Sequence, residues 1–280
     1  MLREARQDGV KTILGVRDII DSPSAVAVEW GGERCRWALA EGYDRVCVYG
    51  SPDIFDPRAE YPIPPKLAER VEFTGYVVRP APLSSASNGH SRPRVLVTMG
   101  GGEDGAGHLD SYLDGLEGSP RVAWESVLVG GPLLDEREAR RLRRRGERIG
   151  KVQVRRFHAD LPHLLAECQA VMAMAGYNTC AEILQSGKPS VLLPRTHPRM
   201  EQAIRAERFQ RRGLTRSLIA PRPADMIAAV ADALAAGAPA REKIPSLDGT
   251  ARLCEVAREL LAAPETARGR IPGRTGTVRP

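Results

Sequence analysis

The chain has 280 residues, of which 42% are hydrophobic and 27% charged, and its formal net charge is +6. These proportions are ordinary for a globular protein and allow one or two domains with a buried core. No apolar run approaches the ~20 residues that cross a bilayer, so we expect no membrane-spanning helix. The surplus of arginine is compatible with binding of an anionic ligand, acidic lipid or nucleic acid, and does not distinguish among these three partners.

The N-terminal residues lack the apolar segment of a signal peptide. We therefore expect a cytoplasmic protein, with at most peripheral contact with the inner face of a membrane. The five cysteines are widely spaced and odd in number, which indicates reduced thiols rather than a disulfide framework.

The first 80 residues carry three short apolar runs, at 12–16, 45–49 and 73–78, which we predict to be strands. A helix is expected near 32–41, and a proline-rich loop follows between 52 and 65. A stretch rich in Pro, Ser and Gly then leads to Pro93. We assign 1–80 to a first α/β domain and 81–93 to an interdomain linker.

Residues 94–264 form a second domain in which strand and helix patterns alternate. Strands are predicted at 94–98, 126–129, 151–155, 170–175 and 190–193. Helices are predicted at 107–116, 135–148, 161–168, 179–186, 200–212, 224–236 and 249–262. This alternation predicts a parallel sheet covered on both faces, with ligands bound at the carboxyl ends of the strands near a topological switch point. The Arg/Gly/Pro/Thr-rich tail, 265–280, is predicted to be disordered.

Glycines mark two junctions between a strand and a helix in this domain. Gly100, Gly101 and Gly102 follow its first strand, and Gly176 follows its fourth. Glycine lets a backbone approach a ligand closely, and the start of a helix offers N–H groups and a positive dipole end to a phosphate. A tight turn without any ligand is an equal alternative for the first junction.

The second junction reads Gly-Tyr-Asn-Thr, and we predict that its helix opens at Thr179 with Glu182 in the first turn. Thr179 and Glu182 fit a capping box, in which each side chain satisfies a backbone donor. In the functional alternative, Asn178 and Thr179 hold a diphosphate, and Glu182 accepts hydrogen bonds from the vicinal hydroxyls of a ribose.

Glu201 and Gln202 open a further helix and lie off its apolar stripe. An acid in the first turn of a helix is favourable without a ligand, but the pair also fits the recognition of hydroxyl groups at the mouth of the same crevice. Arg195 or Arg199 could neutralise phosphate charge, although a solvated surface arginine is the commoner case.

Phe157 and His158 end the third strand of the second domain, where they could hold a flat base. A packed Phe and an exposed His are equally compatible with the sequence. No Asp-x-Asp pair is present to hold a divalent cation, and we expect no metal site. The arginine-rich stretch 137–148 is typical of a solvated helix face, and aromatic residues are only 5% of the chain, so nucleic acid is not an expected partner.

Together these residues resemble the donor-binding half of the GT-B glycosyltransferases, in particular family 28, the group that contains the transferase forming lipid II. The resemblance covers roughly residues 94–214, and 14–21 and 48–77 are similar to a bacterial subgroup of predicted glycosyltransferases. The positions that match the family pattern, with their spacing kept, are Gly176, Asn178, Thr179, Glu182, Leu184, Gly187, Lys188, Pro189, Leu192, Pro194, Glu201 and Gln202.

The resemblance implies an α/β, GT-B-like fold in which a Rossmann-like parallel-sheet domain, 94–264, binds a nucleotide-diphosphate sugar, with a UDP-sugar as the expected donor. It implies transfer of a hexose-type sugar to a hydroxyl acceptor without a metal cofactor, because helix dipoles and donors stabilise the leaving diphosphate. Carried over by position, Gly100–Gly102 and Thr179 would face the diphosphate and Glu182 the ribose. Glu201 and Gln202 would face the sugar, and Phe157 and His158 the base.

The first domain departs from the family because it is short and lacks the glycine-rich loop that receives the acceptor. No general base can be assigned, although Arg17 and Asp18 at the carboxyl end of a strand could face the cleft. One alternative is a nucleotide-sugar-binding subunit, or an inactive truncated form, that needs a partner chain or a homodimer. A second alternative is a nucleotide-sugar 2-epimerase, which shares the fold.

Overall fold

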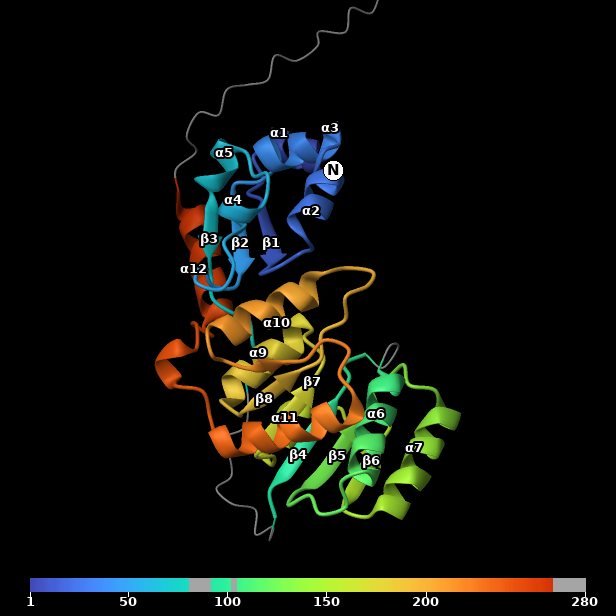
Figure 1. Ribbon diagram of the computed structural model, residues 1–280. Helices are drawn as coiled ribbons and strands as arrows, with labels where there is room; N and C mark the ends of the chain where they lie inside the picture. Colours follow the sequence, from blue (N-terminus) through green and yellow to red (C-terminus); the bar gives the residue numbers. More distant parts are fainter. Residues whose placement is uncertain (81–91, 102–104, 264–280) are drawn as a thin grey trace, which may run out of the picture.

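The computed structural model describes residues 1–80, 92–101 and 105–263, arranged as two α/β units (Figure 1). Most of the expected linker, the expected tail and Gly102 lie outside the described residues. The first unit contains a three-stranded sheet and the second a six-stranded sheet, so the α/β class predicted from the sequence is confirmed.

The sheet of the first unit has the order β1-β2-β3, and all its pairs are parallel. Its strands are β1 (Ile13–Arg17), β2 (Arg45–Tyr49) and β3 (Val71–Phe73). The third strand therefore lies at 71–73, and its prediction at 73–78 was wrong. The chain leaves the sheet after Phe73 because Gly75 has φ +83° and the next amide, that of Tyr76, donates to Ser246 O at 2.8 Å.

Short helices surround this sheet, and several begin at a proline. They are α1 (Leu2–Gln7), α2 (Pro23–Trp30), α3 (Glu33–Trp37), η1 (Ala38–Gly42), α4 (Pro57–Glu60) and α5 (Pro65–Ala68). Proline suits the first turn of a helix because its ring fixes φ and no N–H is needed there. The proline-rich segment predicted to be a loop contains one short helix, α4, and a second, α5, begins at its last residue.

The six-stranded sheet has the order β6-β5-β4-β7-β8-β9, again with every pair parallel. Its strands are β4 (Arg94–Thr98), β5 (Glu125–Val129), β6 (Val152–Arg155), β7 (Ala170–Ala173), β8 (Ser190–Leu192) and β9 (Arg216–Ser217). The sequence predicted five of these to within two residues, and missed β9. The helices are α6 (Ala106–Glu117), α7 (Glu136–Ile149), α8 (Leu161–Ala166), α9 (Tyr177–Ser186), α10 (Glu201–Arg211) and α11 (Pro223–Ala236), followed by the short turn η2 (Arg241–Lys243) and α12 (Gly249–Ala262).

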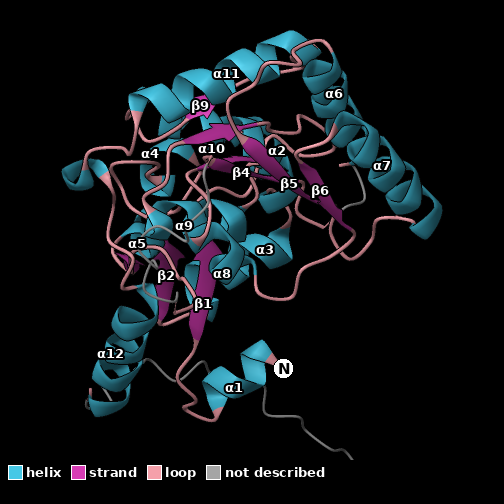
Figure 2. Ribbon diagram, turned by 90° about the horizontal axis from the view of Figure 1, so that it is seen from below, coloured by secondary structure: helices cyan, strands magenta, loops and turns pink. Residues whose placement is uncertain are grey.

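Both faces of this sheet are covered by helices, as Figure 2 shows from below. Successive residues of β4 point to opposite faces: Val95 and Val97 belong to one core cluster, with α6, α7 and α11, whereas Leu96 belongs to the other, with α8, α9 and α10. Strands buried on both sides are apolar at most positions, which explains the nearly continuous hydrophobic runs of the sequence.

The C-terminal helix α12 returns to the first unit and lies beside β3 (Figure 1). Val77 and Asp248 form an isolated antiparallel bridge, and Gly249 N donates to Tyr76 O at 3.1 Å. Arg252 of α12 forms an ion pair with Glu72 of β3. The order of elements along the chain does not reveal this return.

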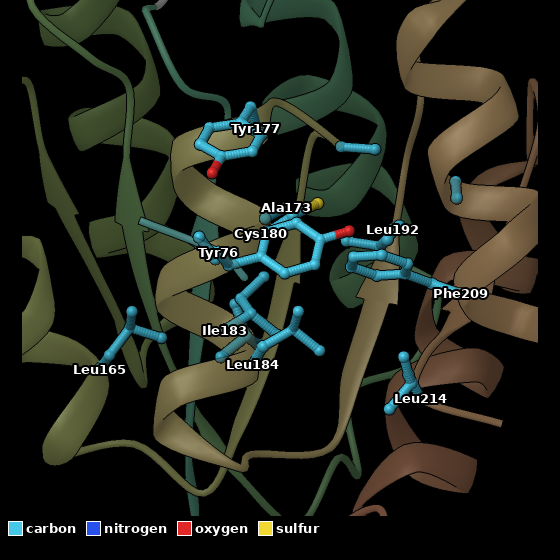
Figure 3. Close-up of a cluster of buried hydrophobic side chains, with 14 of the residues drawn as sticks. Tyr76, Leu165, Ala173, Tyr177, Cys180, Ile183, Leu184, Leu192, Phe209 and Leu214 are labelled. Carbon is cyan, nitrogen blue, oxygen red and sulfur yellow. The ribbon is translucent and has the colours of Figure 1, made fainter. Parts of the chain in front are cut away.

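An aromatic cluster joins the two units (Figure 3). The rings of Tyr76 and Tyr177 stack with centroids 5.7 Å apart, and Phe209 meets Tyr76 edge-on at 6.1 Å. Val77 N donates to the Tyr177 hydroxyl at 3.1 Å, and burial raises the pKa of Tyr177 to about 12. The phenol is therefore neutral at ordinary pH and serves as a fixed acceptor.

A buried ion pair lies beside this cluster. Asp18 follows β1, Arg205 lies in α10, and both side chains are 1% exposed. Arg205 Nη2 and Nε donate to Asp18 at 2.7 and 2.9 Å, and Arg205 Nη1 donates to Ala175 O at 2.7 Å. Burial alone would lower the pKa of Arg205, but the charge and hydrogen bonds of Asp18 outweigh this effect and raise it. This ion pair therefore joins the end of β1 in the first unit to α10 and the end of β7 in the second unit.

Candidate functional site

The two glycine junctions meet where the direction of the six-stranded sheet reverses. Connections run outward in one direction from β4 through β5 to β6, and in the other from β7 through β8 to β9. The neighbours β4 and β7 therefore flank the switch point, and a crevice opens between the chains that leave their carboxyl ends. Gly100 and Gly101 follow β4, and Gly176 follows β7.

A cavity of about 270 Å³ occupies this crevice. Seven of the predicted donor-binding residues line it: Gly100, Gly101, Gly176, Asn178, Thr179, Arg195 and Gln202. Arg17, Met99, Leu133, Met174 and Tyr177 complete its lining. The structure thus brings the two glycine junctions to one hollow, which is the arrangement expected of a phosphate-binding crevice.

The glycine turn after β4 rests on a third glycine that the sequence analysis did not single out. Gly131 has φ +102°, and a Cβ there would lie 2.2 Å from Gly100 O and 2.7 Å from the Gly101 carbonyl carbon. Leu133 N also donates to Gly101 O at 2.9 Å. The segment that contains Gly131 and Leu133 therefore packs against the Gly100–Gly101 turn and restricts its position.

We expect Gly131→Ala to displace this turn, because the backbone of Gly100 and Gly101 cannot yield as a flexible side chain would. The clash and the positive φ together should cost about 1–3 kcal/mol of stability and lower UDP affinity by roughly tenfold. Chemical denaturation and calorimetric titration with UDP measure the two effects. Gly150→Ala is a matched control, since Gly150 has φ +71° with no atom within 4 Å of a Cβ, and it should lower stability without lowering UDP affinity.

The start of α9 differs from the prediction and excludes the capping box between Thr179 and Glu182. The helix begins at Tyr177 with Gly176 as N-cap, so Thr179 lies inside the first turn and Glu182 beyond it. The predicted opening at Thr179 was wrong, and with it the capping box. No side chain among the described residues caps this N-terminus. Its orphan N–H groups are therefore available at the cavity, where Asn178 and Thr179 lie.

Glu182 is nearly buried, with its side chain 8% exposed, and it accepts a hydrogen bond from Arg79 Nη2 at 2.6 Å. Arg79 comes from the end of the first unit, and its own side chain is 64% exposed. Glu182 is not among the residues that line the 270 Å³ cavity. Its partner is a long, exposed side chain, and an exposed ion pair of this kind is weak enough for a ligand to displace.

A second cavity, of about 680 Å³, adjoins the first and extends between the units. Arg17, Gly176, Tyr177, Arg195 and Gln202 line both. The wall from the first unit includes apolar groups such as Leu14, Ile20 and Trp30.

Glu201 and Gln202 lie at the start of α10, on the wall of this larger cavity. Arg195 Nη2 is 3.3 Å from Glu201 Oε1, and Arg195 N donates to Gln202 Oε1 at 3.4 Å. Glu201 Oε2 is shielded from solvent and accepts no hydrogen bond from the described residues. It is an acceptor suited to a hydroxyl group of a bound molecule.

Phe157 and His158 lie after β6, and neither of them lines either cavity. The Phe157 side chain is 51% exposed, and His158 Nδ1 is shielded without a hydrogen-bond partner among the described residues. Their predicted contact with a base remains a prediction.

The arginine-rich helix α7 is paired with its neighbour rather than free on all sides. Arg141 contacts Asp110, and Arg145 contacts Asp110, Asp114 and Glu117 of α6. These ion pairs neutralise part of the positive charge that binding of nucleic acid would require.

Within the described part of the chain, none of the helices combines the length and the hydrophobicity needed to span a membrane.

Two parallel-sheet units with a cleft between them define the GT-B fold class, and comparison with solved structures agrees. The kitacinnamycin glycotransferase aligns over 92% of this chain and 72% of its own, with TM-score 0.64 and 17% identity. The calicheamicin glycosyltransferase CalG4 aligns over 95% and 71%, with TM-score 0.63 and 18% identity. MurG of Acinetobacter baumannii aligns over 92% and 77%, with TM-score 0.58 and 12% identity. At these identities the likeness shows the fold.

Sequence comparison then gives a similarity to one family of these enzymes. Residues 127–239 match the model described as glycosyltransferase family 28 C-terminal domain. The UDP-N-acetylglucosamine--N-acetylmuramyl-(pentapeptide) pyrophosphoryl-undecaprenol N-acetylglucosamine transferase of Nitrobacter winogradskyi is 29% identical over 213 residues, covering 69% of this chain and 56% of that protein. The transferase of the same name from Rhodopseudomonas palustris is 32% identical over 138 residues, covering 46% and 36%. The chain is thus similar to family 28 glycosyltransferases over residues 127–239 and has the GT-B fold, and it spans about half the length, or less, of these curated relatives.

Proposed function

We propose that this protein transfers a hexose-type sugar from a nucleotide diphosphate, with UDP as the expected nucleotide, to a hydroxyl acceptor. The observation that carries the proposal is the shared cavity at the switch point, where the Gly100–Gly101 turn and the uncapped start of α9 converge. Backbone N–H groups and a helix dipole aimed at one hollow suit a diphosphate in the ground state. They suit it better still as charge develops on the departing group.

The remaining groups fit the other parts of such a donor. Arg195 adds positive charge beside the phosphate cavity, and Glu201 Oε2 offers an acceptor to a sugar hydroxyl. The larger cavity is where an acceptor would approach the sugar, and its apolar wall suits a hydroxyl compound with apolar substituents.

A product assay tests this proposal. The chain is incubated with UDP-glucose or UDP-N-acetylglucosamine and a set of hydroxyl acceptors, including polyprenyl-linked sugars, and both UDP and the sugar product are measured. Acceptor-dependent release of UDP is expected, with one sugar attached for each UDP released. Release of a free, isomerised nucleotide sugar without acceptor would contradict transfer and indicate the epimerase instead.

Glu182 gives a sharper prediction for the ribose end of the donor. The structure excludes the capping box, so a ribose contact predicts that Glu182→Gln lowers UDP affinity by about 1–3 kcal/mol, the scale for hydrogen bonds to a charged group. Calorimetric titration with UDP and with 2′-deoxy-UDP separates the causes. The penalty should be smaller for the deoxy compound, which has lost one of the two hydroxyls. An equal penalty for both ligands would contradict the contact with the 2′-hydroxyl, and no penalty would contradict the role altogether.

A further inference from the structure

Arg17 is placed to reach the phosphate cavity from the opposite unit. It ends β1, its side chain is exposed, and it lines both cavities. Of the described residues that surround the 270 Å³ cavity, Arg17 is the one that belongs to residues 1–80. The other lining residues follow strands of the six-stranded sheet or belong to α9 and α10.

The Arg17 guanidinium lies beside an aromatic ring. Its central carbon lies 5.6 Å from the ring centroid of Tyr177, the first residue of α9. Tyr177 is itself fixed, by its stacking on Tyr76 and by the hydrogen bond from Val77. A guanidinium beside an aromatic ring keeps its N–H donors for another partner, and here that partner would lie at the start of α9.

The charge of Arg17 is not neutralised by the acid next to it. Asp18 is already occupied by Arg205, by the Tyr76 hydroxyl at 3.0 Å and by Ile19 N at 2.7 Å. Other arginines along the same cleft do have carboxylate partners: Arg199 pairs with Glu29 at 3.0 Å, and Arg208 with Glu60 at 2.6 Å. Among the described residues, Arg17 has no ion-pair partner. An arginine without a carboxylate, beside an uncapped helix start, favours an anion with several oxygens.

We propose that Arg17 binds the terminal phosphate of the nucleotide diphosphate from the first unit, so that selection of a diphosphate over a monophosphate requires both units. The inference rests on the proposed function and gives a specific role to a residue outside the glycine junctions and outside the family 28 pattern of residues 176–202. The backbone donors of the second unit would bind a monophosphate or a diphosphate. The planar guanidinium of Arg17, with its paired N–H donors, would bind the second phosphate only. Arg17 is then a determinant of specificity rather than of folding.

The test compares UDP with UMP by calorimetric titration of the full chain. In the Arg17→Gln variant, UDP affinity should fall by about 10- to 100-fold, the loss expected for charge-assisted hydrogen bonds, while UMP affinity falls by less than about threefold. Arg17→Lys keeps the charge but loses the paired N–H donors of the guanidinium, and should give an intermediate ratio of UDP affinity to UMP affinity. Arg36→Gln is the matched control: Arg36 is an exposed arginine of α3 that lines neither cavity, and its loss removes the same formal charge.

The outcomes separate this inference from the function on which it rests. An unchanged UDP-to-UMP ratio in Arg17→Gln, with the wild-type chain binding UDP, would overturn the role of Arg17 and leave the donor site standing. An equal change in Arg36→Gln would also overturn it, since the effect would then be long-range charge alone. Failure of the wild-type chain to bind any nucleoside diphosphate would overturn the proposed function, and the inference with it. Thermal unfolding of each variant confirms that the fold is kept.

Discussion

Asp18→Asn is expected to lower the free energy of unfolding by about 3–5 kcal/mol, because it leaves the buried charge of Arg205 without its counter-ion. Both side chains are 1% exposed, so water cannot replace the lost carboxylate. Urea denaturation followed by circular dichroism measures the loss.

A second interunit ion pair provides the control for Asp18. Arg212 and Asp53 are 3.3 Å apart, but their side chains are 29% and 62% exposed. Asp53→Asn should therefore cost at most about 1 kcal/mol. Combining Asp18→Asn with Arg205→Met should recover part of the loss, because the uncompensated charge is then removed. If Asp18→Asn costs no more than Asp53→Asn, the buried pair does not hold the units together as described.

Gly176→Phe is expected to abolish UDP binding, with an affinity loss of at least about 100-fold, while the protein remains folded. Gly176 lines both cavities, no atom lies within 4 Å of a Cβ built there, and its φ of −65° and ψ of 146° suit any residue. A large side chain can therefore enter the space meant for the diphosphate at a cost of about 1 kcal/mol in helix capping.

The chain offers a closely matched control for this change. Gly32 is also an N-cap, with φ −70° and ψ 145°, and a Cβ there also meets nothing within 4 Å. It lines neither cavity. Gly32→Phe should carry the same capping cost and bind UDP as the wild type does. Similar losses of UDP affinity in both variants would point to a general effect of the bulky residue and not to a blocked site.

Much of the second sheet could be predicted because its strands are buried on both faces. Such strands are continuous apolar runs bounded by polar or glycine-rich segments, and their positions were confirmed to within two residues. Local sequence patterns predicted the ends of helices and strands less reliably. Thr179 resembles an N-cap more than Gly176 does, and so the start of α9 was placed too late. The apolar run 73–78 pairs with the segment before α12, a partner that no local pattern reveals.

The site shows the same division between local and distant information. The glycine junctions carry a local signal, and the structure places Gly100, Gly101, Gly176, Asn178 and Thr179 around one cavity; their roles in binding remain predictions. The pair of Asp18 and Arg205 joins residues 187 positions apart and carries no such signal. Gly131 was missed for a related reason, because its importance lies in the backbone of another segment packed against it.

A crystal structure of the chain with UDP shows whether the two glycine junctions bind a diphosphate. We expect the diphosphate to lie in the cavity between Gly101 and the start of α9, within hydrogen-bond distance of the backbone N–H groups of Asn178 or Thr179. UDP bound at another place would contradict it, for example in the 330 Å³ hollow that Trp124 and Arg148 line beside the start of β6. So would a structure obtained at saturating UDP in which the cavity after β4 and β7 contains only water.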